Sequence, residues 1–406
     1  MTLSSFRDAC RGLIIAASIA AAGAPLVAQQ AGVPATTARL TLESVFDRVT
    51  DGALNRADAG GVGRVRAEAS HQRASRRSTA RWWGTVITDQ SVGGAAARTL
   101  AGSAAFDATR TMSRRTRLDM SAQLSSAPLD LFAAFGAADA MSSRDVGTAS
   151  ELDGVRTLSE QMHVTLMRTV APRAELKISA IQSGSRTNRD SVMSTGASIG
   201  LTRRVGQFGG WRLGYGATGD RIERAGFSTM QQRHDIDVGL DYARPLPFWP
   251  RTSVSMATGS TVLSDRTHTY VRLNTNLTMS QQVARRWSLR TEYTRPIQFV
   301  AGLNEPLLSD AIRTTVLGTT SSRLDVAVAM GVARGTLGAG GSGFESYAGS
   351  IRASRRIGPE WVMELEYHDA HYRFDRGAGT RVGGIPGDFS RRGVRAGLVW
   401  APRFGG

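Results

Sequence analysis

The chain has 406 residues, a formal net charge of +16, 41% hydrophobic residues and one cysteine, Cys10. A single cysteine excludes an internal disulfide and a metal site built from several thiolates. Almost all of the positive charge is arginine, because Lys177 is the only lysine.

The N-terminal residues 1–28 have the pattern of a secretory signal peptide. Arg7 and Arg11 precede a short apolar stretch over residues 12–22, and small residues up to Ala28 predict cleavage before Gln29. The apolar stretch is too short to cross a bilayer as a helix, and no later segment offers about 18 consecutive apolar residues. Cys10 would leave with the peptide. We therefore expect an exported chain without transmembrane helices.

From about residue 63 to 404 the apolar residues recur with a period of two. In one segment Val271, Leu273 and Leu277 alternate with polar neighbours, which is typical of a half-buried β-strand. Such segments are about ten residues long, enough to cross a bilayer when tilted. In residues 29–62 the same alternation is weak, at Ala38, Leu40 and Leu42, so this N-terminal segment is predicted to hold a possible first strand.

The connections between these segments alternate in length. Short turns are expected near 114, 171–173, 206–209, 245–250, 281–285, 319–322 and 356–359, and longer connections over 127–158, 184–190, 220–233, 299–309, 336–343 and 374–389. Short periplasmic turns and longer external loops are typical of transmembrane barrels. The pattern predicts an all-β, antiparallel, up-and-down transmembrane barrel over residues 63–404, with about 18 strands and a fallback of about 16.

Tryptophans mark one rim of the predicted barrel. All seven lie beside short turns or at the chain end, and six of them form a predicted interface girdle: Trp82, Trp83, Trp211, Trp249, Trp287 and Trp361. An indole prefers the membrane interface, so this girdle indicates the periplasmic rim. The alternative is that the tryptophans anchor hairpin packing in a soluble protein.

The last segment carries the most specific motif. Val394, Ala396, Leu398 and Trp400 share one face and lead to Phe404. This alternating strand with a final aromatic residue resembles the C-terminal assembly signal of Gram-negative outer-membrane β-barrel proteins. The resemblance implies recognition by the barrel assembly machinery, although Pro402 and the terminal Gly405-Gly406 depart from the pattern. Residues 384–400 also resemble uncharacterised, porin-like barrels, some associated with surface-polysaccharide systems.

The opposite strand faces carry charges of both signs. The predicted lumen-facing candidates are Asp235, Asp237, Asp241, Arg272, Arg290, Glu292, Glu364, Glu366 and His368. Charged side chains on an inward face fit a wet lumen, since burying them unpaired would be costly. The alternative is a filled barrel whose interior charges form salt bridges.

The densest titratable cluster is Glu366, His368, Asp369 and His371. On a helix the two histidines could share a metal, but on a strand they point to opposite faces. We therefore expect no metal, cofactor or catalytic site here. A weak hydrolase alternative remains, because proteolytic barrels use acidic and histidine residues near external strand ends, where Asp369 and His371 are predicted.

These patterns favour a pore for passage or export of a polar solute or sugar polymer. The alternatives are a structural or surface-interaction barrel with a blocked lumen, and an outer-membrane hydrolase. Expected partners are outer-membrane lipid, the barrel assembly machinery and a polar solute or polysaccharide. No nucleic acid is expected, because the arginines fall in scattered pairs without stacking aromatics. The 127–158 connection, with Leu131, Phe132 and Phe135, either forms a constriction or extends a strand; the oligomeric state stays open.

Overall fold

The computed structural model describes residues 35–51, 56–92, 98–128, 156–187, 190–205, 209–224, 227–242, 251–264, 269–295, 297–298, 307–337, 343–375 and 388–402. The predicted signal peptide, Trp249, Phe404 and most of the 127–158 connection lie outside these residues. No helix in the described ranges is long and apolar enough to cross a membrane.

The described elements are all β-strands. The first ten are β1 (Ala35–Asp51), β2 (Arg56–Ala74), β3 (Ser78–Val92), β4 (Arg98–Ser113), β5 (Thr116–Pro128), β6 (Arg156–Ala171), β7 (Ala174–Arg186), β8 (Asp190–Val205), β9 (Gly209–Arg224) and β10 (Phe227–Tyr242). The others are β11 (Thr252–Ser264), β12 (Thr269–Ala284), β13 (Trp287–Thr294), β14 (Ile297–Gln298), β15 (Leu307–Ser321), β16 (Leu324–Leu337), β17 (Gly343–Arg356), β18 (Trp361–Phe374) and β19 (Asp388–Trp400).

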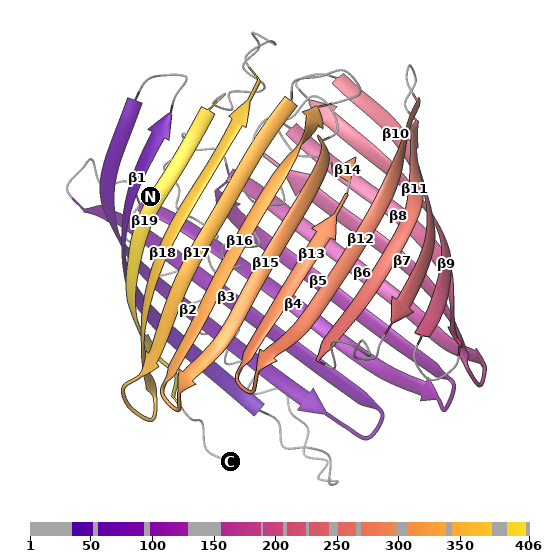
Figure 1. Ribbon diagram of the computed structural model, residues 1–406, viewed down its shortest axis with the longest axis horizontal. Coiled ribbons are helices and arrows are strands. Elements are labelled where there is room, and N and C mark those ends of the chain that lie inside the picture. Colours follow the sequence, from indigo (N-terminus) through magenta and orange to yellow (C-terminus); the bar gives the residue numbers. More distant parts are fainter. Residues whose placement is uncertain are drawn as a thin grey trace, which may run out of the picture.

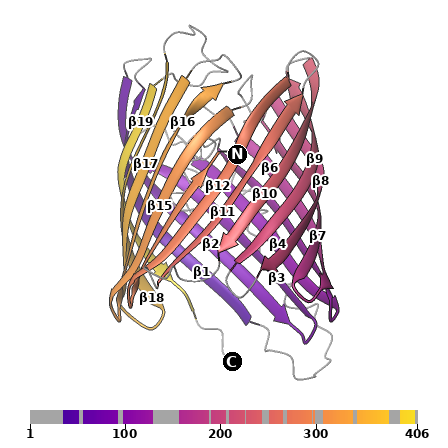
Figure 2. The ribbon, with the colours of Figure 1, turned by 45° about the vertical axis from the view of Figure 1, so that its right-hand side comes forward.

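The strands close into one antiparallel barrel (Figures 1 and 2). Strands pair with their sequence neighbours, and β1 also pairs with β19, with Leu40 opposite Trp400. Because β13 and β14 both pair with β15, they share one position in the wall, which therefore has 18 strands. The predicted strand number is confirmed, and the weak alternation at Ala38, Leu40 and Leu42 lies within β1.

The outer face of this barrel is an apolar belt. On β12, Val271 and Leu273 are 72% and 60% exposed, while Arg272 between them points to the other face. Successive side chains of a strand alternate between faces, so this pattern gives each strand one apolar and one polar side. A soluble protein rarely exposes so continuous an apolar surface, whereas a barrel in lipid requires it.

The short turns form one rim of the barrel. A register shift precedes the turn in four hairpins, as between Thr111 and Ser113 and between Thr319 and Ser321. An arginine carbonyl at the end of six connections accepts a backbone hydrogen bond from a neighbouring hairpin: Arg77, Arg115, Arg173, Arg251, Arg286 and Arg323. These six arginines therefore lie at this rim, which the short turns identify as the periplasmic one.

One predicted connection is wrong. The sequence analysis expected a long connection over 220–233, but β9 continues to Arg224 and β10 begins at Phe227. Arg221 and Met230 are partners in the ladder, as are Glu223 and Ser228. Beyond the lipid the outer face no longer has to be apolar, so the strands continue in polar sequence where the alternation is lost. By contrast, β5 ends at Pro128 and β6 begins only at Arg156.

Candidate functional site

The inner face of the barrel carries most of the predicted lumen residues. The register places on this face Asp235, Asp237, Arg290, Glu292, Glu364, Glu366 and His368. Asp241 lies in β10, but its side chain is outside the described part of the chain. The inner wall is not uniform: on one side these groups are buried, and on the other they are exposed.

The buried side is a chain of ion pairs that crosses five neighbouring strands, which we call the seam network. Its members, from β3 through β2, β1 and β19 to β18, are Asp89, Arg64, Glu43, Arg395 and Glu366. Arg64 donates to both oxygens of Asp89, with Nε–Oδ1 2.7 Å and Nη2–Oδ2 2.9 Å. Glu43 Oε2 lies 3.8 Å from Arg64 Nη1 and 3.6 Å from Arg395 Nε. Arg395 Nη1 is 3.8 Å from Glu366 Oε2.

A second group of polar contacts lies beside this network, nearer the external end. His368 Nε2 is 2.9 Å from Asp47 Oδ1, although their strands are separated by β19. They meet because Gly393, the β19 partner of both, has no side chain; a Cβ there would collide with Asp47 and with the His368 ring. Arg391 donates to the other oxygen of Asp47. The glycine is thus required by this arrangement.

The seam network spans the junction where the two ends of the chain meet. None of its five side chains is more than 7% exposed. Buried ion pairs repay their desolvation only with good geometry, so such pairs act more on specificity than on net stability. Here they connect β1 to both of its neighbours. We infer that they favour the correct register of barrel closure, since a slip of one residue would turn these charges into the lipid.

The opposite wall carries ion pairs that are exposed. On β5, Arg117 Nε is 2.7 Å from Asp119 Oδ1, and Lys177 on β7 is an exposed inner-face cation. Strands β9 to β15 carry further pairs: Arg212–Asp237 at 3.1 Å, Arg233–Asp235 at 3.3 Å and Arg313–Glu292 at 3.6 Å. Arg290 also pairs with Glu292. Charged side chains that stay exposed on an inward face indicate water beside them.

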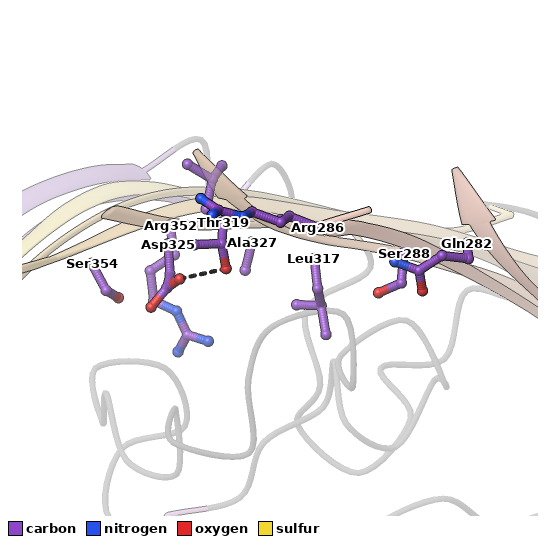
Figure 3. Close-up of a pocket in the computed structure, with 11 residues that line it drawn as sticks. Gln282, Arg286, Ser288, Leu317, Thr319, Asp325, Ala327, Arg352 and Ser354 are labelled. Atoms are coloured by element: carbon purple, nitrogen blue, oxygen red, sulfur yellow. Dashed lines mark hydrogen bonds between the residues drawn. The ribbon is translucent and has the colours of Figure 1, made fainter. Parts of the chain in front are cut away.

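A pocket of about 370 Å³ lies on the inner wall near the periplasmic rim (Figure 3). Ser354, Asp325, Arg352 and Leu317 project from the same side of the sheet, and Thr319 donates a hydrogen bond of 2.8 Å to Asp325. The pocket combines a guanidinium, hydroxyl groups and one half-exposed leucine. Such a surface can contact both the polar groups and the carbon skeleton of a small solute.

Arg272, which was predicted to face the lumen, lies beside an interruption of the wall. β12 continues to Thr269 at the external end, whereas its neighbour β13 stops at Thr294. Beside this interruption Arg272 Nη2 lies 3.6 Å from Asp310 Oδ1, and Asp310 also accepts hydrogen bonds from Arg295 and Tyr293. The side chain therefore bridges a break in the wall, where ladder hydrogen bonds between β12 and β13 end.

The tryptophans divide between the two faces. Trp82, Trp211, Trp287, Trp361 and Trp400 share the outer face with the apolar belt, and the rings of Trp361 and Trp400 lie 6.4 Å apart. Trp83 follows Trp82 directly and so occupies the inner face, where the Arg81 guanidinium lies 5.2 Å from its ring. Its predicted place in the girdle is wrong, because successive residues of a strand alternate.

Charge on the girdle should harm the barrel more than charge on the inner wall. We expect Trp287→Asp to reduce the folded yield severalfold, because the outer face penalises an ionised carboxylate. It would also remove the indole that packs over Gly318, where a Cβ would collide with the ring. Ser288→Asp, one residue later on the inner face, should fold nearly as well as the parent. Electrophoresis with and without heating measures the folded fraction; equal yields would contradict the assignment of faces.

The residues of the predicted assembly signal lie on the outer face of the last strand, whereas the titratable cluster divides between the two faces. Val394, Ala396, Leu398 and Trp400 lie in the apolar belt, and their recognition by the assembly machinery stays a prediction. His368 points inward, whereas Asp369 and His371 point outward, as expected for a strand. Asp369 Oδ1 is 3.2 Å from Arg392 Nε, and His371 Nδ1 is 3.6 Å from Asp388 Oδ1.

Most members of the seam network were not among the predicted site residues. Of the seam network only Glu366 was named, and of the second group beside it only His368. Glu43, Arg64, Asp89 and Arg395 of the network, and Asp47 and Arg391 of the second group, were not named. A signal was present, because Arg64 and Arg66 alternate with Val65, and Arg395 alternates with Val394 and Ala396. Paired charges at inner positions of the first and last strands would have pointed to this junction.

Comparisons with known proteins establish the fold. No family model and no curated protein matches the chain. Among solved structures, the apoprotein form of the FrpB iron transporter from Neisseria meningitidis (F5-1 variant) has a TM-score of 0.51 at 8% identity, covering 90% of this chain and 81% of that one. Pseudomonas aeruginosa OccK2 (OpdF) has a TM-score of 0.48 at 9% identity, covering 91% and 98% of the two chains. Acinetobacter baumannii OccAB4 has a TM-score of 0.47 at 10% identity, covering 92% of this chain and 99% of that one.

The closed wall and the apolar outer belt decide the location. A closed barrel has no unpaired edge strand, which is the condition for crossing lipid with strands. The chain is a β-barrel of the outer membrane. The similarity to the FrpB iron transporter is a similarity of fold.

Proposed function

We propose that the barrel is a channel through which polar solutes cross the outer membrane. The observation that carries this proposal is the exposed, charged inner wall from β5 to β15, including Lys177, Arg117 and Arg290. Barrels of about 16–18 strands are wide enough to leave an aqueous path. Side chains that filled such a lumen would have buried these charges.

The wall indicates what kind of solute would pass. Its carboxylates and guanidiniums alternate in close pairs, such as Arg212 with Asp237 and Arg233 with Asp235. Paired charges largely cancel at a distance, so this wall creates no strong field of one sign. Hydroxyl-rich solutes, including sugars, fit such a surface, because both donors and acceptors are available. Export of a sugar polymer would be a special case of the same path.

A second candidate is a structural barrel with a blocked lumen. It is favoured by one observation: inner-face aromatic residues at the external end are buried and packed together. Tyr372 stacks on Phe389 with 5.5 Å between ring centroids, and Phe374 lies edge-on to Tyr372 at 5.8 Å. This cluster and the seam network occupy the β17–β3 side only. We propose that the path runs along the other side.

The hydrolase alternative has less support. Asp369 and His371 share the outer face, and each is paired with another charged group, Arg392 and Asp388 respectively. A general base needs a free acceptor within reach of a substrate proton. Asp369 and His371 are each paired with a charged neighbour and do not present such an acceptor. We therefore propose a channel rather than an enzyme.

An osmotic swelling assay tests the channel proposal. The purified, folded barrel is inserted into liposomes, which are diluted into isotonic sugars of increasing size. We expect fast swelling in arabinose and slower swelling in larger sugars, because the exposed side of the lumen admits small polar solutes. Liposomes carrying heat-unfolded protein are the control. Swelling no faster than in that control for every sugar would contradict the proposal and favour the blocked barrel.

A further inference from the structure

Two arginines face each other on the outer wall of the barrel. Arg48 on β1 and Arg392 on β19 are direct partners in the ladder, and both are exposed. Like charges directly opposite each other destabilise a strand pair. Asp369 lies 3.2 Å from Arg392 on its other side. Among the side chains that the structure describes, no carboxylate forms an ion pair with Arg48.

The surface around the two arginines is a groove of about 550 Å³. On its membrane side it is lined by Phe46, Val394 and Tyr367, and Phe46 is 64% exposed. On β2 the lining is Ala59, Gly60 and Gly61, which have little or no side chain. The groove is thus apolar toward the belt and cationic at its outer end.

The height of this groove follows from the register. Arg392 and Arg48 lie eight residues along their strands from the partners Trp400 and Leu40. At about 3.3 Å per residue this is roughly 26 Å along the strand, or about 20 Å along the membrane normal for a tilt of about 40°. The apolar band of such barrels is about 25 Å tall. Measured from the periplasmic girdle, the arginines therefore lie near the headgroups of the outer leaflet.

We propose that Arg48 and Arg392 together bind a phosphate of an outer-leaflet lipid, whose acyl chains lie over Phe46, Val394 and Tyr367. A phosphate between two guanidiniums would replace their repulsion by charge-assisted hydrogen bonds. The occupant is assigned to a lipid because the floor of the groove is apolar and continuous with the belt. This proposal rests on the location of the barrel and is independent of its channel function.

Another outer-face arginine provides a matched control. Arg221 on β9 is as exposed as Arg392, at 61%, but its Nη2 lies 2.6 Å from Glu223 Oε1. Its ladder partners are Met193 and Met230, so it faces no second cation. A general attraction of the barrel to anionic lipid would weaken equally on replacing Arg221 or Arg48. A phosphate site would weaken only with Arg48 or Arg392.

Native mass spectrometry of the folded, full-length barrel in detergent tests this site. Diphosphoryl lipid A is added to the parent protein and to the Arg48→Gln, Arg392→Gln and Arg221→Gln variants. We expect one retained lipid on the parent and on Arg221→Gln. The first two variants should bind about tenfold more weakly, as expected for losing one charge-assisted hydrogen bond. Lipid A without phosphates should bind weakly to all four proteins.

Two results would overturn the proposal: equal binding of diphosphoryl lipid A by all four proteins, or equal binding of the phosphorylated and phosphate-free lipids by the parent. Thermal unfolding gives a second readout. Without lipid, Arg48→Gln should unfold at the same or a higher temperature than the parent, because the repulsion is gone. With diphosphoryl lipid A, only the parent and Arg221→Gln should be stabilised. A lipid-free Arg48→Gln that is clearly less stable than the parent would show that Arg48 has a structural partner instead.

Discussion

Replacing Arg64 by Met is expected to destabilise the folded barrel by about 3–5 kcal/mol, the cost of breaking a buried ion pair from one side. Arg64 is one of the two cations of the seam network, bonded to both oxygens of Asp89 and close to Glu43. Without it, two carboxylates would remain on a buried wall that offers them little water. We expect the Arg64→Met variant either to give no folded protein or to unfold at a lower urea concentration than the parent.

The control for this variant is the next residue. Val65 is on the outer face and 40% exposed, so Val65→Met should change stability by no more than about 0.5 kcal/mol. The double variant Arg64→Met, Asp89→Leu should regain part of the loss, because it removes the uncompensated carboxylate. Urea unfolding in detergent, followed by the heat-dependent shift in electrophoresis, measures all four proteins. Equal midpoints for Arg64→Met and Val65→Met would contradict the role of the seam network.

Reversing two lumen charges should change ion selectivity strongly. Replacing both Lys177 and Arg290 by Glu changes the lumen charge by about four units, since each substitution removes one positive charge and adds one negative. Both side chains are exposed on the inner wall, Arg290 by 63%. Fixed charges in a narrow, low-dielectric passage bias which ions enter. We therefore expect a clear shift toward cation selectivity with little effect on folding.

The reversal potential under a salt gradient measures this shift. Arg221→Glu, which changes a charge on the outer face of the barrel, is the control and should leave the potential unchanged. Arg272 is unsuitable, because it bridges the break beside β13 through Asp310 and its loss would alter the wall itself. An active double variant with the parent's reversal potential would show that Lys177 and Arg290 lie outside the ion path.

The architecture was predictable because it depends on a local pattern. Alternation such as Val271, Leu273 and Leu277 on one face of β12 is visible in any short window, and its repetition predicts the barrel. β1 was harder to predict, since polar residues interrupt its alternation, and the sequence indicated it only as a possible first strand. The long connection predicted over 220–233 was wrong because polar residues interrupt the alternation there too. Where strands leave the lipid, alternation ends while pairing continues.

The candidate site was less predictable because it depends on distant residues. Arg391 and Asp47 are 344 positions apart, and only barrel closure brings them together. His368 meets Asp47 because Gly393 lies between them, a relation between three strands that no sequence window contains. Likewise the alternation of β12 indicates a face for Arg272, but its ion pair with Asp310 depends on where β13 stops. Local periodicity determines faces, whereas partners follow from register.

Single-channel recording of the wild-type barrel in planar bilayers tests the central claim most directly. Purified, heat-modifiable protein is added to one side, and current is followed at fixed voltage. An exposed, charged lumen wall predicts discrete conductance steps in most insertions, with only modest preference for either ion sign. Insertion without any conductance, verified by recovering folded barrel from the membrane, would contradict the account and identify a barrel whose lumen is closed.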